Sequence, residues 1–239
     1  MFPEGTLLFL NMQASGPPSA SREGDLSVPS GALPAGRHSL TREVVLASQR
    51  GRLLDAMAQA VSDHGYGATT VAHVVALAGV SRKTFYEHFS DKEDCFLALY
   101  DTGIAYVLGR IEETLGAAET PAQCPIERVA VGLRAFLSVL AEAPAFSRAI
   151  LLEVHAAGGA ALLRRRATLE GFARRYEDIN AEARAEDPSI RVLDHDIAIA
   201  LVAGIVELAA TRIADGQAHT LPDLAEPLIA FVGRQVAPT

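Results

Sequence analysis

The segment from Thr70 to Cys95 carries the side chains whose types and spacing could do chemistry. A short predicted helix turns hydrogen-bond donors and amphipathic side chains outward, and these are Ser81, Arg82, Lys83, Thr84, Tyr86 and His88. Such groups donate to phosphates and to base edges, and a helix that carries them near its N-terminal end fits a DNA major groove. The chemistry that this pattern predicts is non-covalent recognition of double-stranded DNA.

Two short helices joined by a tight turn must position these side chains. Thr70 is predicted to cap a helix over residues 71–77, and Gly79 can take the left-handed conformation that ends it. Ser81 is predicted to cap the second helix, which continues through Phe89, with Phe85 and Phe89 anchoring it to a core. The arrangement is a helix-turn-helix.

Five different short motifs follow one another at fixed spacing in this region. They are Gly65-Tyr66, Thr69-Thr70-Val71, Ala78-Gly79-Val80-Ser81, Phe85-Tyr86-Glu87-His88-Phe89 and Lys92-Glu93. In these motifs the chain resembles the TetR family of transcriptional regulators, over roughly residues 42–100. Beyond that stretch only length and helical character agree with the family.

The resemblance implies a role for each outward residue. Thr70, Tyr86 and Lys92 match positions that hold backbone phosphates, which orient a protein on DNA without reading its sequence. Arg82, Lys83 and Thr84 are the candidates for contacts to base edges, and His88 could do either. Two alternatives stay open, because Tyr86 could pack against the following helix and Ser81 is better explained as a helix cap than as a base contact.

Composition agrees with a globular protein that has one end facing nucleic acid. The 239 residues carry a net charge of −8, yet residues 37–90 hold six basic and four acidic residues. Residues 96–239 hold 13 basic and 19 acidic residues, so the acidity lies in the C-terminal part. The two cysteines, Cys95 and Cys124, exclude a disulfide framework, and no apolar run is long enough to predict a membrane span. We expect a cytoplasmic protein.

The periodicity predicts an all-α protein of about nine helices in three parts. Residues 1–36, rich in Gly, Pro and Ser, are expected to be disordered, residues 37–92 to form the helix-turn-helix domain, and residues 93–239 to form an effector-binding and dimerisation domain. The Ser90-Asp-Lys-Glu93 sequence is predicted to start a long helix as a capping box. The later helices are predicted over residues 126–141, 144–158, 160–186, 194–214 and 222–236.

The last two predicted helices point to a homodimer. Residues 197–206 are apolar on every side, so that helix must be buried all round, and a second copy of the chain would bury it. The predicted interface residues are Leu201, Ile205, Leu208, Leu221, Leu224, Leu228 and Val232. TetR-like regulators are similar in joining through their last two helices, and such a dimer implies a palindromic operator.

The resemblance also implies a pocket for a small, largely apolar effector among the middle helices. The candidate lining residues are Phe136, Leu140, Phe146, Arg148, Leu151, Leu152, His155, Phe172 and Tyr176, with Glu153 as a further polar group. The alternative is that these residues form a filled core.

Other chemistry is not supported. Asp194-His195-Asp196 and the pair Glu153 and His155 suggest a metal, but residues two apart on a helix do not share a face. The arginines at 164–166 and 174–175 are interpreted as a solvated helix face paired with acidic neighbours. No spacing of nucleophile and base predicts an enzyme, and no cofactor is expected. The sequence therefore predicts a dimeric repressor released from DNA by a small effector, and the alternative is an interaction protein that keeps the fold without specific DNA binding.

Overall fold

The computed structural model describes residues 42–117 and 125–237 and is built from helices alone. In these residues it contains nine α-helices and two 3₁₀ helices, and no strand. The all-α prediction is confirmed. The predicted disordered tail, residues 1–36, lies outside the described residues.

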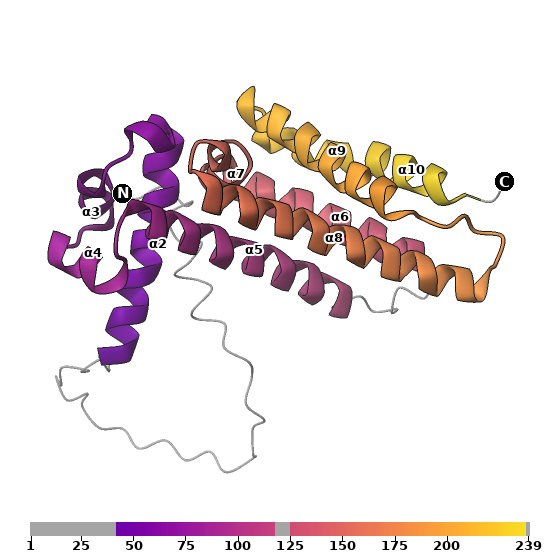
Figure 1. The fold of residues 1–239 in the computed structure, drawn as a ribbon, viewed down its shortest axis with the longest axis horizontal. Coiled ribbons are helices and arrows are strands. Elements are labelled where there is room, and N and C mark those ends of the chain that lie inside the picture. The colour runs from indigo at the N-terminus through magenta and orange to yellow at the C-terminus, as the bar shows by residue number, and fades with distance from the viewer. Residues whose placement is uncertain (1–41, 118–124, 238–239) are drawn as a thin grey trace, which may run out of the picture.

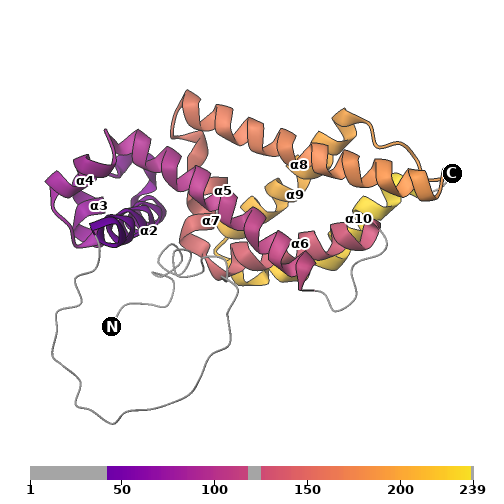
Figure 2. The same ribbon diagram turned by 90° about the horizontal axis from the view of Figure 1, so that it is seen from below.

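The chain forms a small N-terminal unit at one end of a longer helical body (Figure 1). Helices α2 (Arg42–Ala68), α3 (Val71–Ala78) and α4 (Arg82–His88) make up the N-terminal unit. The body contains α5 (Lys92–Gly116), α6 (Pro125–Glu142), α7 (Pro144–Leu151), η2 (Glu153–His155), α8 (Gly159–Glu186), α9 (His195–Ala214), η3 (Ala218–Leu224) and α10 (Ala225–Val236). Viewed from below, α5 runs from the N-terminal unit along the body, with α8 on one side of it and α6 on the other (Figure 2).

The predicted caps and turn of the two short helices are confirmed, and a break precedes them. Gly65 leaves the helical conformation at φ 75° and ψ 156°, so α2 is interrupted there. The Thr70 side chain accepts a hydrogen bond from the His73 N–H, and Gly79 ends α3 at φ 63° and ψ 37°. Ser81 caps α4 by accepting from the Thr84 N–H.

Three predicted boundaries are wrong. The cap of α5 is Asp91, not Ser90, because the Asp91 carboxylate accepts from the Asp94 N–H at 2.8 Å. Helix α7 ends at Leu151 rather than near residue 158, and a 3₁₀ turn follows it. The last helix begins at Ala225 rather than at Pro222, which lies inside η3.

One core joins the N-terminal unit to the body. Phe85 from α4 and Phe96 from α5 are fully buried in the same cluster as Met57 from α2. The edge of the Tyr66 ring meets the Phe96 ring at a centroid distance of 5.0 Å. Because α5 contributes to both parts, a displacement of α5 must be accommodated in the packing of the N-terminal unit.

Helix α9 lies in the body as a core helix with one uncovered face. Leu201 and Ile205 are buried, whereas Ile197 and Leu208 are exposed. The single chain therefore covers only part of this helix, and its covering by a second copy stays a prediction. By length and composition α9 is the one helix in the described residues that could cross a membrane as an unbroken span. Its inner face packs against α7 and α8.

Gly103 tests how closely α5 approaches α7. A Cβ at Gly103 would lie 1.9 Å from Phe146 Cε2, so Gly103→Ala forces the ring or the helix to move. We expect this overpacking to lower the free energy of unfolding by about 1–3 kcal/mol, measured by urea denaturation. Gly109→Ala in the same helix is the control, because nothing lies within 4 Å of its Cβ. The control should gain about 0.5–1 kcal/mol from better helix propensity, and equal effects of the two variants would contradict the close approach.

Candidate DNA-binding segment and candidate ligand cavity

Helix α4 presents polar side chains away from the core. Its inner side is held by Phe85, which is fully buried, and by Phe89, which follows the helix and is also buried. The outward set is as the sequence predicts, with Thr70, Ser81, Arg82, Lys83 and Tyr86 exposed and Thr84 and His88 half-buried. The structure thus exposes five of the eight predicted DNA-contacting residues and leaves Thr84, His88 and Lys92 half-buried.

Ser81 and Tyr86 bear on the alternatives that the sequence leaves open. Ser81 Oγ is a helix cap and also shares a hydrogen bond of 3.0 Å with Thr84 Oγ1. Tyr86 is 57% exposed, and its ring contact is with Phe85 of its own helix at 5.4 Å between centroids. The phenol hydroxyl group of Tyr86 is therefore available to a partner outside the chain.

His88 is the least accessible member of the set. Burial is the main cause that lowers its pKa, and the charge of Arg50 acts in the same direction. The imidazole is therefore neutral at pH 7, and a neutral ring is a hydrogen-bonding group rather than a phosphate-binding cation.

Lys92 is half-buried and binds inside the protein. Its Nζ donates to the Tyr66 carbonyl oxygen at 2.8 Å and lies 4.1 Å from the centroid of the Tyr66 ring. The backbone N–H of the same tyrosine donates to Glu153 Oε2, also at 2.8 Å. We call these three residues the Tyr66 joint. It ties the broken end of α2 to the start of α5 and to η2.

Sequence reasoning missed the Tyr66 joint. It predicts Lys92 to be a phosphate contact and treats Glu153 as a polar group of the effector pocket, whereas in the structure both residues bind Tyr66. The Gly65-Tyr66 motif was the available signal, since a helix break leaves backbone groups that need partners. Nothing in the sequence pairs residue 66 with residue 153, which lies in another helical layer.

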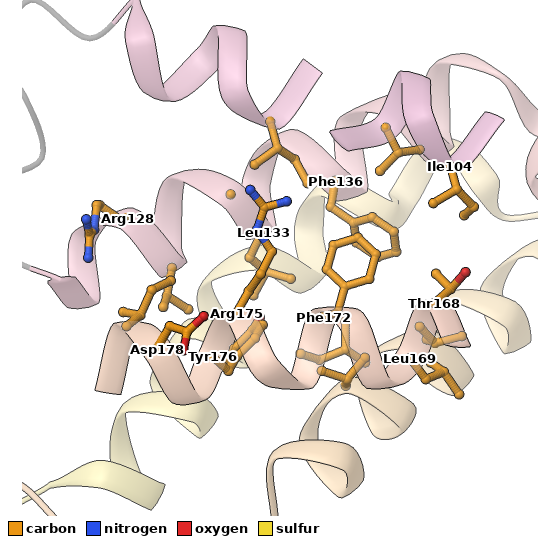
Figure 3. A pocket seen from close by; sticks show the side chains of 18 of the residues that line it. Ile104, Arg128, Leu133, Phe136, Thr168, Leu169, Phe172, Arg175, Tyr176 and Asp178 are labelled. Carbon is orange, nitrogen blue, oxygen red and sulfur yellow. The ribbon is translucent and has the colours of Figure 1, made fainter. Parts of the chain in front are cut away.

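The body contains an elongated cavity of about 330 Å³ between α5, α6, α7, α8 and α9. Figure 3 shows Phe136 from α6 and Phe172 from α8 close together in the middle of it, with Arg128 and Asp178 toward one end and Ile104 and Thr168 toward the other. The cavity follows α5 from Tyr100 to Leu115, which is about 22 Å at the helical rise of about 1.5 Å per residue. A cavity of that length has room for an extended ligand.

The structure separates the predicted pocket residues into two groups. Phe136, Leu151, Phe172 and Tyr176 line the cavity. The other five predicted residues are not in its wall, and two of them, Leu152 and His155, lie beyond the end of α7 at Leu151. Leu140 and Phe146 are buried in the core, Leu152 is half-buried, Arg148 Nη2 lies 3.9 Å from Glu153 Oε1, and His155 is exposed.

Most of the wall was not anticipated from the sequence. Helix α5 contributes Ile104, Val107, Ile111 and Leu115, whose spacing of three or four residues was the available signal. Helix α8 contributes polar groups, including Arg165, Thr168 and Arg175. Burial raises the pKa of Tyr176 to about 12, so this phenol is a neutral hydrogen-bonding group in the wall.

The residues predicted for the dimer interface are mostly covered inside one chain. Leu201, Ile205, Leu221, Leu228 and Val232 are buried and Leu224 is half-buried, which leaves Leu208 as the exposed member. The apolar stripe of the last helices packs inward against α6 and α8. The exposed apolar side chains on this side of the body are Ile197 and Leu208 of α9 and Phe231 of α10.

The residues suggested as metal ligands have other partners or face apart. His195 Nδ1 lies 2.6 Å from Glu177 Oε1, and Asp194 occupies the N-cap position of α9 without a side-chain hydrogen bond to the helix. Within the described ranges no group of three or more His, Cys, Asp or Glu side chains could hold a metal ion. Cys95 is fully buried, and burial raises the pKa of its thiol well above the usual range.

The short exposed helix, its anchoring aromatics and the helical body define a helix-turn-helix protein. Residues 53–99 match the family model described as bacterial regulatory proteins, tetR family. Residues 53–99 therefore carry the helix-turn-helix domain of the TetR family, as the motifs predict. Members and curated relatives are regulators rather than enzymes, in agreement with the interpretation that the chain has no catalytic site.

Curated relatives match only part of the chain. The repressor AcnR of Corynebacterium diphtheriae is 39% identical over 54 residues, which are 23% of this chain and 28% of AcnR. The activator FasR of Mycolicibacterium smegmatis is 29% identical over 82 residues, or 34% of this chain and 37% of FasR. The fatty acid metabolism regulator protein of Bacillus subtilis is 27% identical over 90 residues, or 38% and 44%. The chain therefore matches less than half the length of these relatives.

Solved structures extend the similarity of the fold to the body. FadR from Bacillus halodurans superposes with a TM-score of 0.68 at 18% identity, covering 77% of this chain and 94% of that one. FadR from Bacillus subtilis, solved in complex with stearoyl-CoA, gives a TM-score of 0.67 at 21% identity, covering 78% and 98%. The overall architecture, body included, is that of these regulators.

The Tyr66 joint makes a testable contribution to stability. Glu153→Ala removes the charged acceptor of the Tyr66 N–H, a side chain that is only 17% exposed, and should lower the free energy of unfolding by about 1.5–3 kcal/mol. Glu153→Gln keeps an acceptor and should lose less. Glu113→Ala is the control, because its ion pair with Arg110 is solvated and is expected to contribute under about 1 kcal/mol. Thermal and urea unfolding measure all three variants, and a Glu153→Ala variant as stable as the control would show that the contact is dispensable.

Proposed function

We propose that this chain is a transcriptional regulator that binds DNA through α4 and is controlled by an apolar effector in the cavity. The observation that carries the proposal is the outward set on α4, which the buried Phe85 and Phe89 hold in place on a packed scaffold. Donors on a rigid, exposed helix are what major-groove recognition needs. Such a protein acts where the DNA is, which places it in the cytoplasm of a bacterial cell.

Different residues serve the two kinds of DNA contact. Arg82 and Lys83 extend from the first turn of α4 and are proposed to read base edges, together with Thr84. Thr70 and Tyr86, on either side of that turn, are proposed to bind backbone phosphates. Lys92 already donates to the Tyr66 carbonyl oxygen. A DNA phosphate would therefore share the Lys92 ammonium group with the Tyr66 joint.

A second copy of the chain is proposed to cover the exposed face of α9 and α10. Ile197 and Leu208 of α9 and Phe231 of α10 are 45%, 48% and 40% exposed, and large apolar side chains at the surface are candidates for an interface. A symmetric pair of these faces would form a four-helix interface. The two α4 helices would then meet half-sites about one helical turn of DNA apart, or a multiple of it, and the operator would be palindromic.

The effector is proposed to contain an unbranched alkyl chain. The cavity is long, and its wall is mostly aliphatic and aromatic. An extended hydrocarbon contacts such a wall along its whole length, which a compact ring system does not. The stearoyl-CoA complex of the Bacillus subtilis FadR, a protein of similar fold, supports an acyl compound as the effector.

Helix α5 is proposed to couple the cavity to the DNA. It begins at Lys92 in the Tyr66 joint and lines the cavity from Tyr100 to Leu115. A ligand that favours one position of α5 shifts the population of dimers toward one separation of the two α4 helices. We propose that the bound form releases DNA, so that the chain is a repressor. The relatives include one repressor and one activator, and that sign depends on where the operator lies relative to the promoter.

The runner-up is an interaction protein that keeps the fold without specific DNA binding. The exposure of Arg82, Lys83 and Tyr86 favours a DNA-binding regulator. A protein that did not bind DNA would not require two cations and a phenol on this short helix. DNA-binding measurements separate the two functions directly.

Fluorescence anisotropy on the DNA that flanks the chain's own gene tests the function. We expect the wild-type chain to bind it at least about a thousandfold more tightly than a scrambled duplex. Arg82→Ala should lose about 1–3 kcal/mol on the operator and little on scrambled DNA, because it removes a base contact. Lys92→Ala should weaken binding to both duplexes alike and reduce the salt slope by about one.

Three outcomes would contradict parts of this scheme. Failure to bind either duplex at low salt would bring the interaction protein forward. An unchanged salt slope in Lys92→Ala would restrict Lys92 to the Tyr66 joint. Stearoyl-CoA that binds the chain but does not change the anisotropy of the DNA complex would remove the proposed coupling.

The dimer is tested by placing charge on its proposed face. Leu208→Asp combined with Phe231→Asp buries four carboxylates across a symmetric interface, so the dissociation constant should rise at least about 100-fold. Analytical ultracentrifugation measures the mass, and circular dichroism confirms that the variant is folded. Leu163→Asp, at a position on α8 that is 70% exposed, is the control and should remain dimeric. A double variant that keeps the wild-type mass would place the interface elsewhere.

A further inference from the structure

Three arginines line the cavity, and two of them are already neutralised. Arg128 Nη2 forms an ion pair with Glu182 Oε2, joining α6 to α8. Arg175 Nη2 donates to Glu112 Oε1 at 3.1 Å, joining α8 to α5. For Arg165 no acidic partner lies within ion-pair distance in the described part of the chain. Of the three cavity-lining arginines, Arg165 is therefore the one whose positive charge is not neutralised by an ion pair in the described residues.

The neighbours of Arg165 in the sequence show that this difference comes from geometry. Arg164 Nε donates to both carboxylate oxygens of Asp101, at 3.1 and 3.0 Å. Arg166 Nε donates to Glu170 Oε1 at 2.9 Å on its own helix. Successive residues on a helix point about 100° apart, so the middle arginine is directed between these two and reaches the cavity. The interpretation of this arginine run as a solvated, paired face holds for Arg164 and Arg166 but not for Arg165.

The surroundings of Arg165 form the end of the cavity nearer to the N-terminal unit. Tyr100 and Thr168 line this end, and Thr168 is one helical turn from Arg165. Burial raises the pKa of Tyr100, while a side-chain hydrogen bond with Thr168 and the charge of Arg165 act against that rise. Figure 3 shows Thr168 and Ile104 at the opposite end from Arg128 and Asp178. The carboxylates that line the cavity, Asp178 and Glu182, therefore lie at the far end from Arg165.

We propose that Arg165 binds the anionic end of the alkyl effector, a carboxylate or a phosphate. This inference rests on the proposed function and adds the position of the charged group. A guanidinium donates two parallel hydrogen bonds to either anion. The attraction between the two charges is stronger where water is partly excluded. The alkyl chain of the ligand then runs past Phe136 and Phe172 toward Leu115 and Ile179, away from the N-terminal unit. The charged group of the ligand lies beside the Arg164–Asp101 ion pair, which fastens α8 to α5.

The test compares anionic and neutral ligands of equal chain length on three chains. The probes are palmitate, palmitoyl-CoA and hexadecanol, each titrated by calorimetry or by displacement of a fluorescent fatty acid. The chains are the wild type, Arg165→Gln and the matched control Arg166→Gln, whose arginine is exposed and does not line the cavity. Losing a hydrogen-bonded charge contact should weaken binding of the anionic probes roughly 10–100-fold in Arg165→Gln. Hexadecanol should bind both variants as it binds the wild type, and Arg166→Gln should leave all three affinities unchanged.

The results distinguish the source of the anion and the ways in which the proposal fails. A loss confined to palmitate identifies a carboxylate at Arg165, and a loss confined to palmitoyl-CoA identifies a phosphate. Equal losses for palmitate and hexadecanol in Arg165→Gln would mean that Arg165 only shapes the cavity, which overturns the proposal. A further variant, Arg175→Gln, tests the opposite orientation of the ligand. If it loses affinity for the anionic probes while Arg165→Gln does not, the anion lies at the other end of the cavity and the proposal is overturned. If the wild-type chain binds none of the probes, the alkyl effector itself is wrong and the anchor falls with it.

Discussion

The backbone N–H and C=O of Tyr66 are both bound by charged side chains, and the relation between the two parts of the molecule depends on these contacts. Gly65 breaks α2, which frees the Tyr66 N–H from the helix, while the Tyr66 C=O also accepts from the Thr69 N–H at 3.3 Å. Glu153 accepts from the first and Lys92 donates to the second, each at 2.8 Å. The acceptor comes from the helical body and the donor from the start of α5. Moving the Tyr66 backbone would break these hydrogen bonds to charged side chains or displace Glu153 and Lys92 with it. The Tyr66 joint therefore fixes the N-terminal unit relative to the body.

Helix α5 extends from that point into the site where a ligand would act. Its first turn is in the Tyr66 joint, its middle is packed against α7 through the close approach of Gly103 and Phe146, and its second half lines the cavity. A single helix that is fixed at one end and borders an elongated cavity at the other converts a change in cavity width into a rotation about its fixed end. The proposed coupling between effector and DNA needs no other moving part.

The sequence predicts the local structure well and the contacts across layers poorly. The caps at Thr70 and Ser81, the turn at Gly79 and the break at Gly65 were predictable because each depends on a side chain within four residues. The hydrogen bond between the Tyr66 N–H and Glu153 was not predictable, because 87 residues separate the two and no periodicity of the sequence indicates the contact. Of the pocket residues expected on and after α7, only Leu151 lines the cavity. Leu152 and His155 follow the end of that helix, which comes earlier than the apolar pattern suggests. The arginines at 164–166 have the same side chain three times, and only the helix geometry tells them apart.

The inward packing of the last two helices has a consequence for how the chain would respond to its own abundance. Leu221, Leu228 and Val232 are buried within one chain, so a single chain is a complete folded unit before it meets a second. Folding and association are then separate equilibria, and the amount of dimer follows mass action rather than folding. At chain concentrations below the dissociation constant, operator occupancy would rise with the square of expression. A cell could therefore sharpen the response of such a regulator through gene dosage alone, without any change in the effector.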